Sequence, residues 1–142
     1  MPEKTVYRYV NMLANHQRRR FESMELGVPL SSTEAKILHF ILGYDEDVFQ
    51  KDVEEEFSMR APSATELLKS MEQKGLLNRV PSESDGRRKK IVVSAEAVKY
   101  KPMLDRELDQ VEKQLTKDLD RKEIEAWKVI SEKMIRNLQD RK

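Results

Sequence analysis

The most distinctive chemical feature of the sequence is a run of four cationic side chains behind an Asp-Gly turn dipeptide. The run is Arg87-Arg88-Lys89-Lys90, and the dipeptide is Asp85-Gly86. Guanidinium and ammonium groups of this kind suit ion pairs with phosphate oxygens. The flanking residues Leu76–Val80 and Lys90–Ser94 have the composition of short strands. We therefore predict a β-hairpin whose charged tip binds phosphate.

The sequence gives little support for a metal site or a catalytic site. The 142 residues include no cysteine, which excludes disulfides, thiolate nucleophiles and cysteine-based metal sites. His16 and His39 are too few for a histidine-rich metal site. No nucleophile motif, phosphate loop or metal-ligand spacing is present. We expect no catalytic residue, no metal and no cofactor, so the protein is not expected to be an enzyme.

The charge of the chain is segregated, although its formal net value is only +1. Residues 79–90 contain five basic and two acidic side chains, a local charge of +3. Residues 45–56 contain seven acidic side chains and one lysine, a local charge of −6. Local segregation, not net charge, therefore favours nucleic acid binding, and we expect most of the acidic stretch to face away from a duplex.

The sequence indicates a protein of the cytoplasm. The first ten residues lack the apolar segment of a signal peptide. No stretch approaches the roughly 18 apolar residues that a membrane-spanning helix needs. We expect no membrane partner.

Hydrophobic periodicity places helices along the first half of the chain. It predicts a helix over about residues 4–25, which Gly27 and Pro29 end. Ser31 and Glu34 form an S-x-x-E capping box that opens a second helix, which stops at Gly43. A short third helix is predicted over about residues 48–57.

A further helix follows after a bend of about four residues, which is the spacing of a helix-turn-helix. It ends at Lys74-Gly75, where glycine suits a left-handed cap. Pro62 in the first turn would place the N-cap at Ala61. Alternatively, Ser63 is the N-cap and Glu66 completes a second capping box. The residues themselves leave both alternatives open.

A helix-turn-helix followed at once by a hairpin is the winged-helix arrangement, and it provides two probes for a DNA duplex. The second helix, about residues 62–74, fits the major groove. The wing, residues 81–90, can reach the minor groove, where Arg87 is the best candidate for insertion and Asp85 would orient it. The predicted DNA-binding residues are Arg60, Pro62, Ser63, Thr65, Glu66, Lys69, Asp85, Arg87, Arg88, Lys89 and Lys90.

The last part of the chain reads as two long helices, with Pro102 either kinking or starting the first, and Asp120 with Glu123 capping the second. Their apolar stripes exceed what a small winged core can cover. We favour a homodimer over an intramolecular helical layer. The predicted interface residues are Val6, Tyr9, Leu13, Leu104, Leu108, Val111, Leu115, Ile124, Trp127, Met134 and Leu138.

These residues together resemble the multiple-antibiotic-resistance regulator (MarR) family over nearly the whole chain. The most specific segments are Pro62–Thr65, Met71–Arg79 and Ser84–Ser94, the last of which resembles the family's D-x-R wing signature. The resemblance implies an obligate homodimer on a pseudo-palindromic operator. It also implies wing-tip roles for Asp85 and Arg87. Glu66 departs from the family, which commonly has a basic residue there.

The resemblance also suggests a small aromatic or amphipathic effector at the junction between the dimer helices and the winged lobe. Tyr9, Met12, His16 and His39 could line that junction, although a methionine or a lone histidine on an apolar face is far more often part of the core.

We expect a mainly α fold with a small β-hairpin. It would comprise an N-terminal dimerisation helix (residues 1–30), a winged helix-turn-helix domain (31–95) and C-terminal dimerisation helices (96–142). The predicted function is a dimeric, sequence-specific DNA-binding transcriptional regulator, a repressor that a small-molecule effector relieves. The alternative is a winged-helix module that binds protein instead of DNA.

Overall fold

A computed structural model of the chain describes residues 2–84 and 86–139, which form helices around a small antiparallel sheet. The chain divides into two compact units, residues 1–108 and residues 109–142. The elements are α1 (Val6–Glu22), α2 (Ser32–Leu42), β1 (Val48–Phe49), α3 (Gln50–Glu56), α4 (Ala61–Gln73), β2 (Leu77–Pro81), β3 (Lys89–Val93), α5 (Ala95–Val98), α6 (Lys101–Leu115) and α7 (Arg121–Gln139).

Two helix starts confirm the predicted capping pairs. At α2, the Glu34 N–H donates to Ser31 Oγ at 3.1 Å, and the Ser31 N–H donates to Glu34 Oε1 at 2.9 Å. At α7, the Glu123 N–H donates to Asp120 Oδ1 at 2.8 Å, and the Asp120 N–H donates to Glu123 Oε1 at 2.9 Å. Each pair satisfies two backbone donors that the first turn of a helix leaves open.

The carboxylate of Glu34 also forms an ion pair with the residue that caps the end of α4. Glu34 is only 3% exposed. Lys74 Nζ donates to both of its oxygens, at 2.8 and 3.0 Å. Burial raises the pKa of Glu34, but the hydrogen bonds from Lys74 and the Ser31 backbone, with the charge of Lys74, outweigh it and lower the pKa. The ion pair therefore ties the start of α2 to the end of α4.

The sheet has three strands in the order β1-β3-β2, all antiparallel, where the sequence predicted only a hairpin. Leu77 pairs with Val93 and Pro81 with Lys89, so β2 and β3 form the predicted wing. Val48 pairs with Ile91 on the other edge of β3. The expected start of the third helix at residue 48 was therefore wrong. Val48 and Phe49 are extended because they pair with β3, and the helix begins at Gln50.

The predicted helix-turn-helix is present, with α3 and α4 separated by residues 57–60. Both proposed caps of α4 were wrong, because Ala61 is already helical and Arg60 is the N-cap. Pro62 is tolerated at the second helical position because that backbone N–H has no partner within the helix either. Ser63 then lies one residue further into the first turn.

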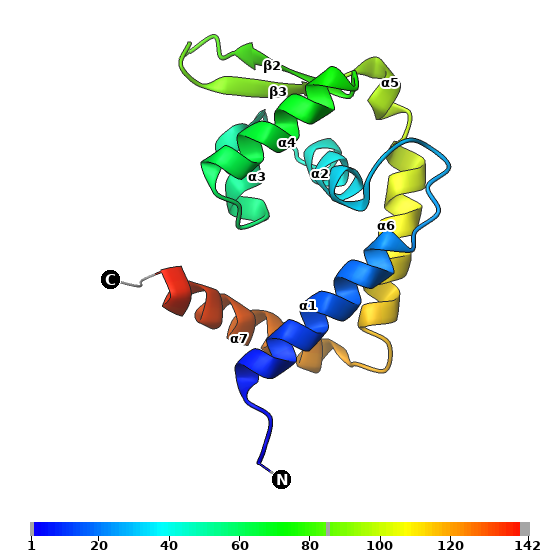
Figure 1. Cartoon of the computed structure of the whole chain (residues 1–142), viewed down its shortest axis with the longest axis vertical. Coiled ribbons are helices and arrows are strands. Elements are labelled where there is room, and N and C mark those ends of the chain that lie inside the picture. The colour runs from blue at the N-terminus through cyan, green and yellow to red at the C-terminus, as the bar shows by residue number, and fades with distance from the viewer. Residues whose placement is uncertain (1, 85, 140–142) are drawn as a thin grey trace. The chain divides into compact units, whose positions relative to one another are not determined.

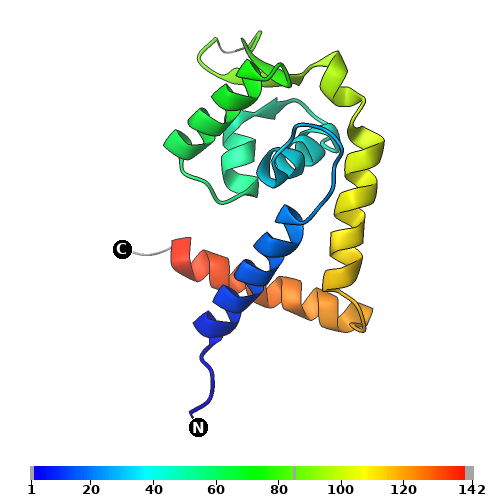
Figure 2. The ribbon, with the colours of Figure 1, turned by 45° about the vertical axis from the view of Figure 1, so that its right-hand side comes forward.

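The hydrophobic core lies where α2 meets the helix-turn-helix, the sheet and the first half of α6. In two views α2 lies between the α3–α4 pair and α6 (Figures 1 and 2). Phe21, in the last turn of α1, meets α2 through Lys36, whose Nζ lies 4.5 Å from the ring centroid. The fully buried large side chains are Ile37, Leu38, Val53, Leu68, Met71, Leu77 and Leu104.

The structure corrects two of the predicted dimer-interface residues. Leu104 is 0% exposed and belongs to the core cluster with Ile37 and Leu38. Val111 is 4% exposed within the chain itself. Both sit on the apolar stripe of α6, but the chain's own packing already covers that part of the stripe. Pro102 lies in the first turn of α6, so it starts this helix and does not kink it.

Replacing Gly75 by alanine is expected to lower the free energy of unfolding by about 1 kcal/mol, because a left-handed backbone strains any residue with a Cβ. Gly75 has a φ of +76° directly after α4, as its predicted cap role requires. Gly86→Ala is the matched control, because no atom lies within 4 Å of a Cβ there and its φ is not left-handed. Urea denaturation would measure both variants. Equal stabilities for the two would contradict the strain argument.

Candidate nucleic-acid interface

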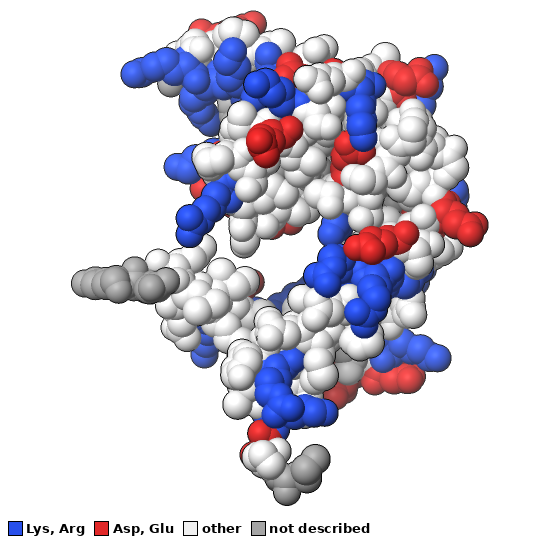
Figure 3. Space-filling view, in the orientation of Figure 1, with Lys and Arg blue, Asp and Glu red and all other residues white. Residues whose placement is uncertain are grey.

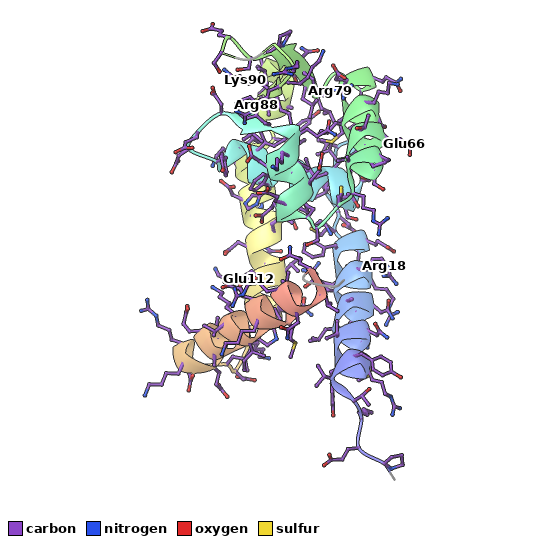
Figure 4. The ribbon with its side chains drawn as sticks, turned by 90° about the vertical axis from the view of Figure 1, so that its left-hand side faces the viewer. Arg18, Glu66, Arg79, Arg88, Lys90 and Glu112 are labelled. Carbon is purple, nitrogen blue, oxygen red and sulfur yellow. The ribbon has the colours of Figure 1, made fainter. Side chains whose placement is uncertain are left out.

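Helix α4 carries a buried face and an open face. Ala64, Leu68 and Met71 are buried against the core, at the spacing of one helix face. Figure 4 shows Glu66 pointing away from α4. The predicted contact residues Arg60, Pro62, Ser63, Glu66 and Lys69 are all exposed, from the residue just before the helix to the start of its second half. The side chains that the sequence predicted for the major groove are therefore available on one open surface.

Thr65 differs from its neighbours because it is only partly exposed and has a protein partner. The side-chain amide of Gln50, the first residue of α3, donates to Thr65 Oγ1 at 2.9 Å. The same amide nitrogen donates to Glu54 Oε2 at 3.2 Å. The sequence analysis did not find Gln50, because the hydrogen bond links positions fifteen residues apart on two different helices.

The predicted wing places its cations at and beside the hairpin tip. Arg87 and Arg88 lie in the turn, and Lys89 and Lys90 begin β3. Figure 3 shows basic side chains gathered where the β2–β3 hairpin ends. Arg87, Arg88 and Lys89 are exposed, and Lys90 is partly covered. The predicted role of Asp85 concerns a residue outside the described part of the chain.

Two of the four cations contact the edge strand that the sequence analysis missed. The guanidinium carbon of Arg88 lies 3.8 Å from the centroid of the Phe49 ring. Lys90 Nζ lies 3.3 Å from Asp47 Oδ1. Both labelled side chains lie near the sheet in Figure 4. Phe49 of β1 therefore contacts Arg88, and Asp47, the residue just before β1, partly neutralises Lys90.

Most of the acidic stretch of residues 45–56 was expected to face away from a duplex, but at least one of its side chains contacts the wing. Asp47 reaches the wing, and Asp52 Oδ2 accepts the N–H of Phe49 at 2.8 Å. The charge of Asp52, followed by partial burial and the charges of Glu46, Glu55 and Glu56, raises the pKa of the Tyr44 hydroxyl. A negative potential therefore borders the start of the helix-turn-helix.

The wing is fixed to α4 by a pairing at its base. Arg79 Nε and NH2 each donate to Glu72 Oε1 at 2.9 Å, and the Arg79 backbone N–H donates to Glu72 Oε2 at 3.3 Å. These backbone and side-chain hydrogen bonds from Arg79 lower the pKa of Glu72. Because Arg79 lies in β2, the two predicted probes, α4 and the wing, are joined at one end by this ion pair (Figure 4).

The four residues predicted for an effector are not brought together by any contact in the described residues. Tyr9, Met12 and His16 are exposed along α1, and His16 Nδ1 lies 3.3 Å from an Arg19 nitrogen. His39, on α2, contacts Asp105 of α6 instead, with its Nε2 3.3 Å from Oδ1. Within the same residues, no group of histidine, cysteine or acidic side chains could hold a metal ion, and no helix has the length and apolar character to span a bilayer.

Apolar side chains remain uncovered on α1 and α7, the helices predicted for dimerisation. Neither helix has a buried residue within the described chain. Leu108, Ile124 and Met134 are partly exposed. The other predicted interface residues are largely exposed, namely Val6, Tyr9, Leu13, Leu115, Trp127 and Leu138. Apart from Leu104 and Val111, the predicted set is therefore accessible to a partner.

Comparison with known proteins identifies a consistent group of relatives. A sequence model of the MarR family matches residues 26–88. The structure is similar to the transcription regulator MarR from Oenococcus oeni, with 28% identity, 93% of this chain and 99% of that chain covered, and a TM-score of 0.84. No curated protein matches the chain in sequence.

Two more distant structures share the fold and were crystallised with DNA. One is the MepR–DNA complex of S. aureus, with 20% identity, 95% of this chain and 99% of that chain covered, and a TM-score of 0.81. The other is a Listeria monocytogenes regulator of MarR type in complex with a 26mer DNA. It has 16% identity, with 97% of this chain and 91% of that chain covered, and a TM-score of 0.83.

Proposed function

We propose that this chain, whose residues 26–88 match the MarR family model and whose structure is similar to that of a MarR transcription regulator, is itself a winged-helix transcription regulator and not an enzyme. It would bind a duplex operator as a homodimer and repress transcription there. The observation that carries the proposal is the open face of α4 beside a basic wing tip. Hydroxyls and Lys69 on α4 suit base edges and phosphates in the major groove. Arg87 at the wing tip suits the negative potential of the minor groove.

The proposed dimer rests on the uncovered apolar side chains of α1 and α7. Helices of this length are stabilised mainly by packing of an apolar face. A second copy of the chain is the partner proposed to cover them, because one two-fold axis would then place two winged lobes on one duplex. Such a dimer fits a pseudo-palindromic operator with half-sites roughly 34–36 Å apart.

A small aromatic or amphipathic effector is proposed to relieve repression. The exposed Tyr9 and Met12 on α1 provide an aromatic and a polarisable surface for such a molecule. Binding there would couple to DNA affinity only if the effector prefers one arrangement of the dimer helices over another.

A salt titration of duplex binding tests the proposed function directly. Each phosphate that the protein neutralises adds about 0.9 to the slope of log affinity against log salt concentration. We expect a slope that reports several phosphates per dimer, measured on the DNA of the protein's own promoter region. Undetectable duplex binding at low salt would reject the proposal and favour a winged-helix module that binds protein.

Replacing Arg87 by alanine is expected to weaken duplex binding about tenfold and to reduce the salt slope by about 0.9 for each wing. The cause is the loss of an exposed guanidinium at the tip of the hairpin. Fluorescence anisotropy with a labelled duplex would measure the change. Lys99→Ala, which removes an exposed cation at the C-cap of α5, is the control that should bind like the wild type. An Arg87 variant with unchanged affinity would mean that the wing is not a DNA probe.

Replacing Asp47 by asparagine is expected to strengthen duplex binding about twofold to fivefold at low salt, because it releases Lys90 from its ion pair. The salt slope should become steeper as Lys90 contacts phosphate. Asp109→Asn removes the same charge from an exposed pair with Lys113 on α6 and is the matched control. If both variants gain equally, net charge alone explains the effect and the contact between Asp47 and Lys90 has no specific role.

A further inference from the structure

Two consecutive residues, where β1 ends and α3 begins, contact the two proposed DNA probes. Phe49 ends β1 and lies under Arg88 of the wing. Gln50 begins α3 and donates to Thr65 of α4. Their side chains therefore contact one residue on each probe, although neither belongs to α4 or to the wing hairpin.

We propose that Phe49 and Gln50 are positioning residues that set how Arg88 and Thr65 meet a DNA duplex. The two form a bracket: Phe49 orients the Arg88 guanidinium, and Gln50 orients the Thr65 hydroxyl. This inference rests on the proposed DNA-binding function and adds to it two specificity-determining residues that need not touch DNA.

The Phe49 half of the bracket works through the shape of a guanidinium. With its carbon 3.8 Å from the ring centroid, Arg88 is within the range of a cation–π contact. A guanidinium that stacks by its face keeps the N–H groups along its edge available for a phosphate. Phe49 is itself fixed, because it pairs with Lys90 across the sheet and its N–H donates to Asp52. Phe49 therefore limits the directions in which Arg88 can present its donors.

The Gln50 half of the bracket works through hydrogen-bond polarity. Glu54, in its ionised form, only accepts hydrogen bonds, so the end of the Gln50 amide that faces it must be the NH2 group. The same NH2 group donates to Thr65 Oγ1. The Thr65 hydroxyl then acts as an acceptor toward Gln50, which leaves its own proton for another acceptor. Phosphate oxygens, guanine O6 and N7, adenine N7 and thymine O4 are such acceptors on DNA.

The decisive experiment compares affinity with base discrimination for single and double variants of the full-length protein. The probes are duplexes that the wild-type protein selects from a random-sequence library, together with versions altered by one base pair. Gln50→Met keeps the length of the side chain but cannot donate to Thr65. We expect it to reduce discrimination at the positions facing Thr65 about threefold to tenfold, the range for one hydrogen bond. The salt slope should stay unchanged.

Phe49→Leu tests the other half of the bracket. It removes the ring beneath Arg88, and we expect duplex affinity to fall about twofold to fivefold, the range for one cation–π contact. Phe49→Trp should restore affinity because tryptophan is the strongest cation–π partner. If Phe49→Leu acted only through folding, it would weaken binding to every duplex by the same factor and would lower the melting temperature. Phe49→Trp would then not restore affinity.

Double-mutant cycles complete the test. Phe49→Leu should have no further effect once Arg88→Ala is present, and Gln50→Met none once Thr65→Val is present. Wild-type protein that fails to bind any duplex would defeat the proposed function itself. Wild-type binding with additive effects in both cycles would leave that function intact and overturn the bracket.

Discussion

Leu104→Ala is expected to lower the free energy of unfolding by about 3 kcal/mol, within the range of roughly 2–5 kcal/mol for a buried leucine reduced to alanine. Leu104 is 0% exposed and lies in the core cluster of the first unit. Three heavy atoms would be lost from a site where α6 meets α2, and the cavity could close only in part. Urea denaturation at several protein concentrations is the measurement.

Leu115→Ala is the matched control because Leu115 lies on the same helix but is 44% exposed. Leu115 is a proposed interface residue, so Leu115→Ala should lower stability only by weakening the dimer. Its effect should therefore depend on protein concentration. The effect of Leu104→Ala should instead persist at all concentrations. If weakened dimerisation accounted for the whole loss in the Leu104 variant, the side chain would belong to the interface that the sequence suggested.

The contrast between Leu104 and Leu115 shows what periodicity can and cannot predict. A repeat of apolar residues correctly predicts which face of α6 is apolar, but it holds no information about what covers that face. Leu104 and Val111 on this face are covered by the chain itself, whereas Leu115, at the end of the same helix, remains 44% exposed. Only three-dimensional packing distinguishes the covered positions from the exposed one.

The features predicted most accurately are those that depend on residues close together in the chain. The Ser31–Glu34 and Asp120–Glu123 capping pairs, the left-handed Gly75 and the helix-turn-helix spacing each depend on residues within a few positions, and each is confirmed. The exact start of α4 was wrong by one residue because proline suits more than one position in the first turn.

The missed features depend on contacts between distant segments. A two-residue strand is too short for an alternating pattern, so β1 became visible only through its pairing with β3. Consequently Asp47, Phe49 and Gln50 could not be predicted from sequence as partners of Lys90, Arg88 and Thr65. The sequence identified the cations and the hydroxyl but not the segment that orients them.

Trp127→Glu is expected to convert the proposed dimer into monomers at micromolar concentration and to weaken operator binding about 100-fold to 10,000-fold. Trp127 is 56% exposed on α7, a helix without a buried residue in the described chain. A carboxylate would have to lose its hydration in an apolar interface, which is strongly unfavourable without a partner. The loss of affinity is large because two linked lobes bind one duplex with a high effective concentration, whereas separate lobes bind independently.

Sedimentation velocity and anisotropy on the same samples would test both parts of this prediction. Lys128→Glu, an exposed neighbour of Trp127, adds negative charge to the same helix without removing an apolar side chain. It should remain dimeric, so it separates charge repulsion of DNA from loss of the interface. A Trp127 variant that stays dimeric, with affinity like that of the Lys128 variant, would place the subunit contact elsewhere. A variant that becomes monomeric yet binds the operator as tightly as the wild type would show that one winged lobe suffices, and the two-fold symmetry of the proposed complex would have no basis.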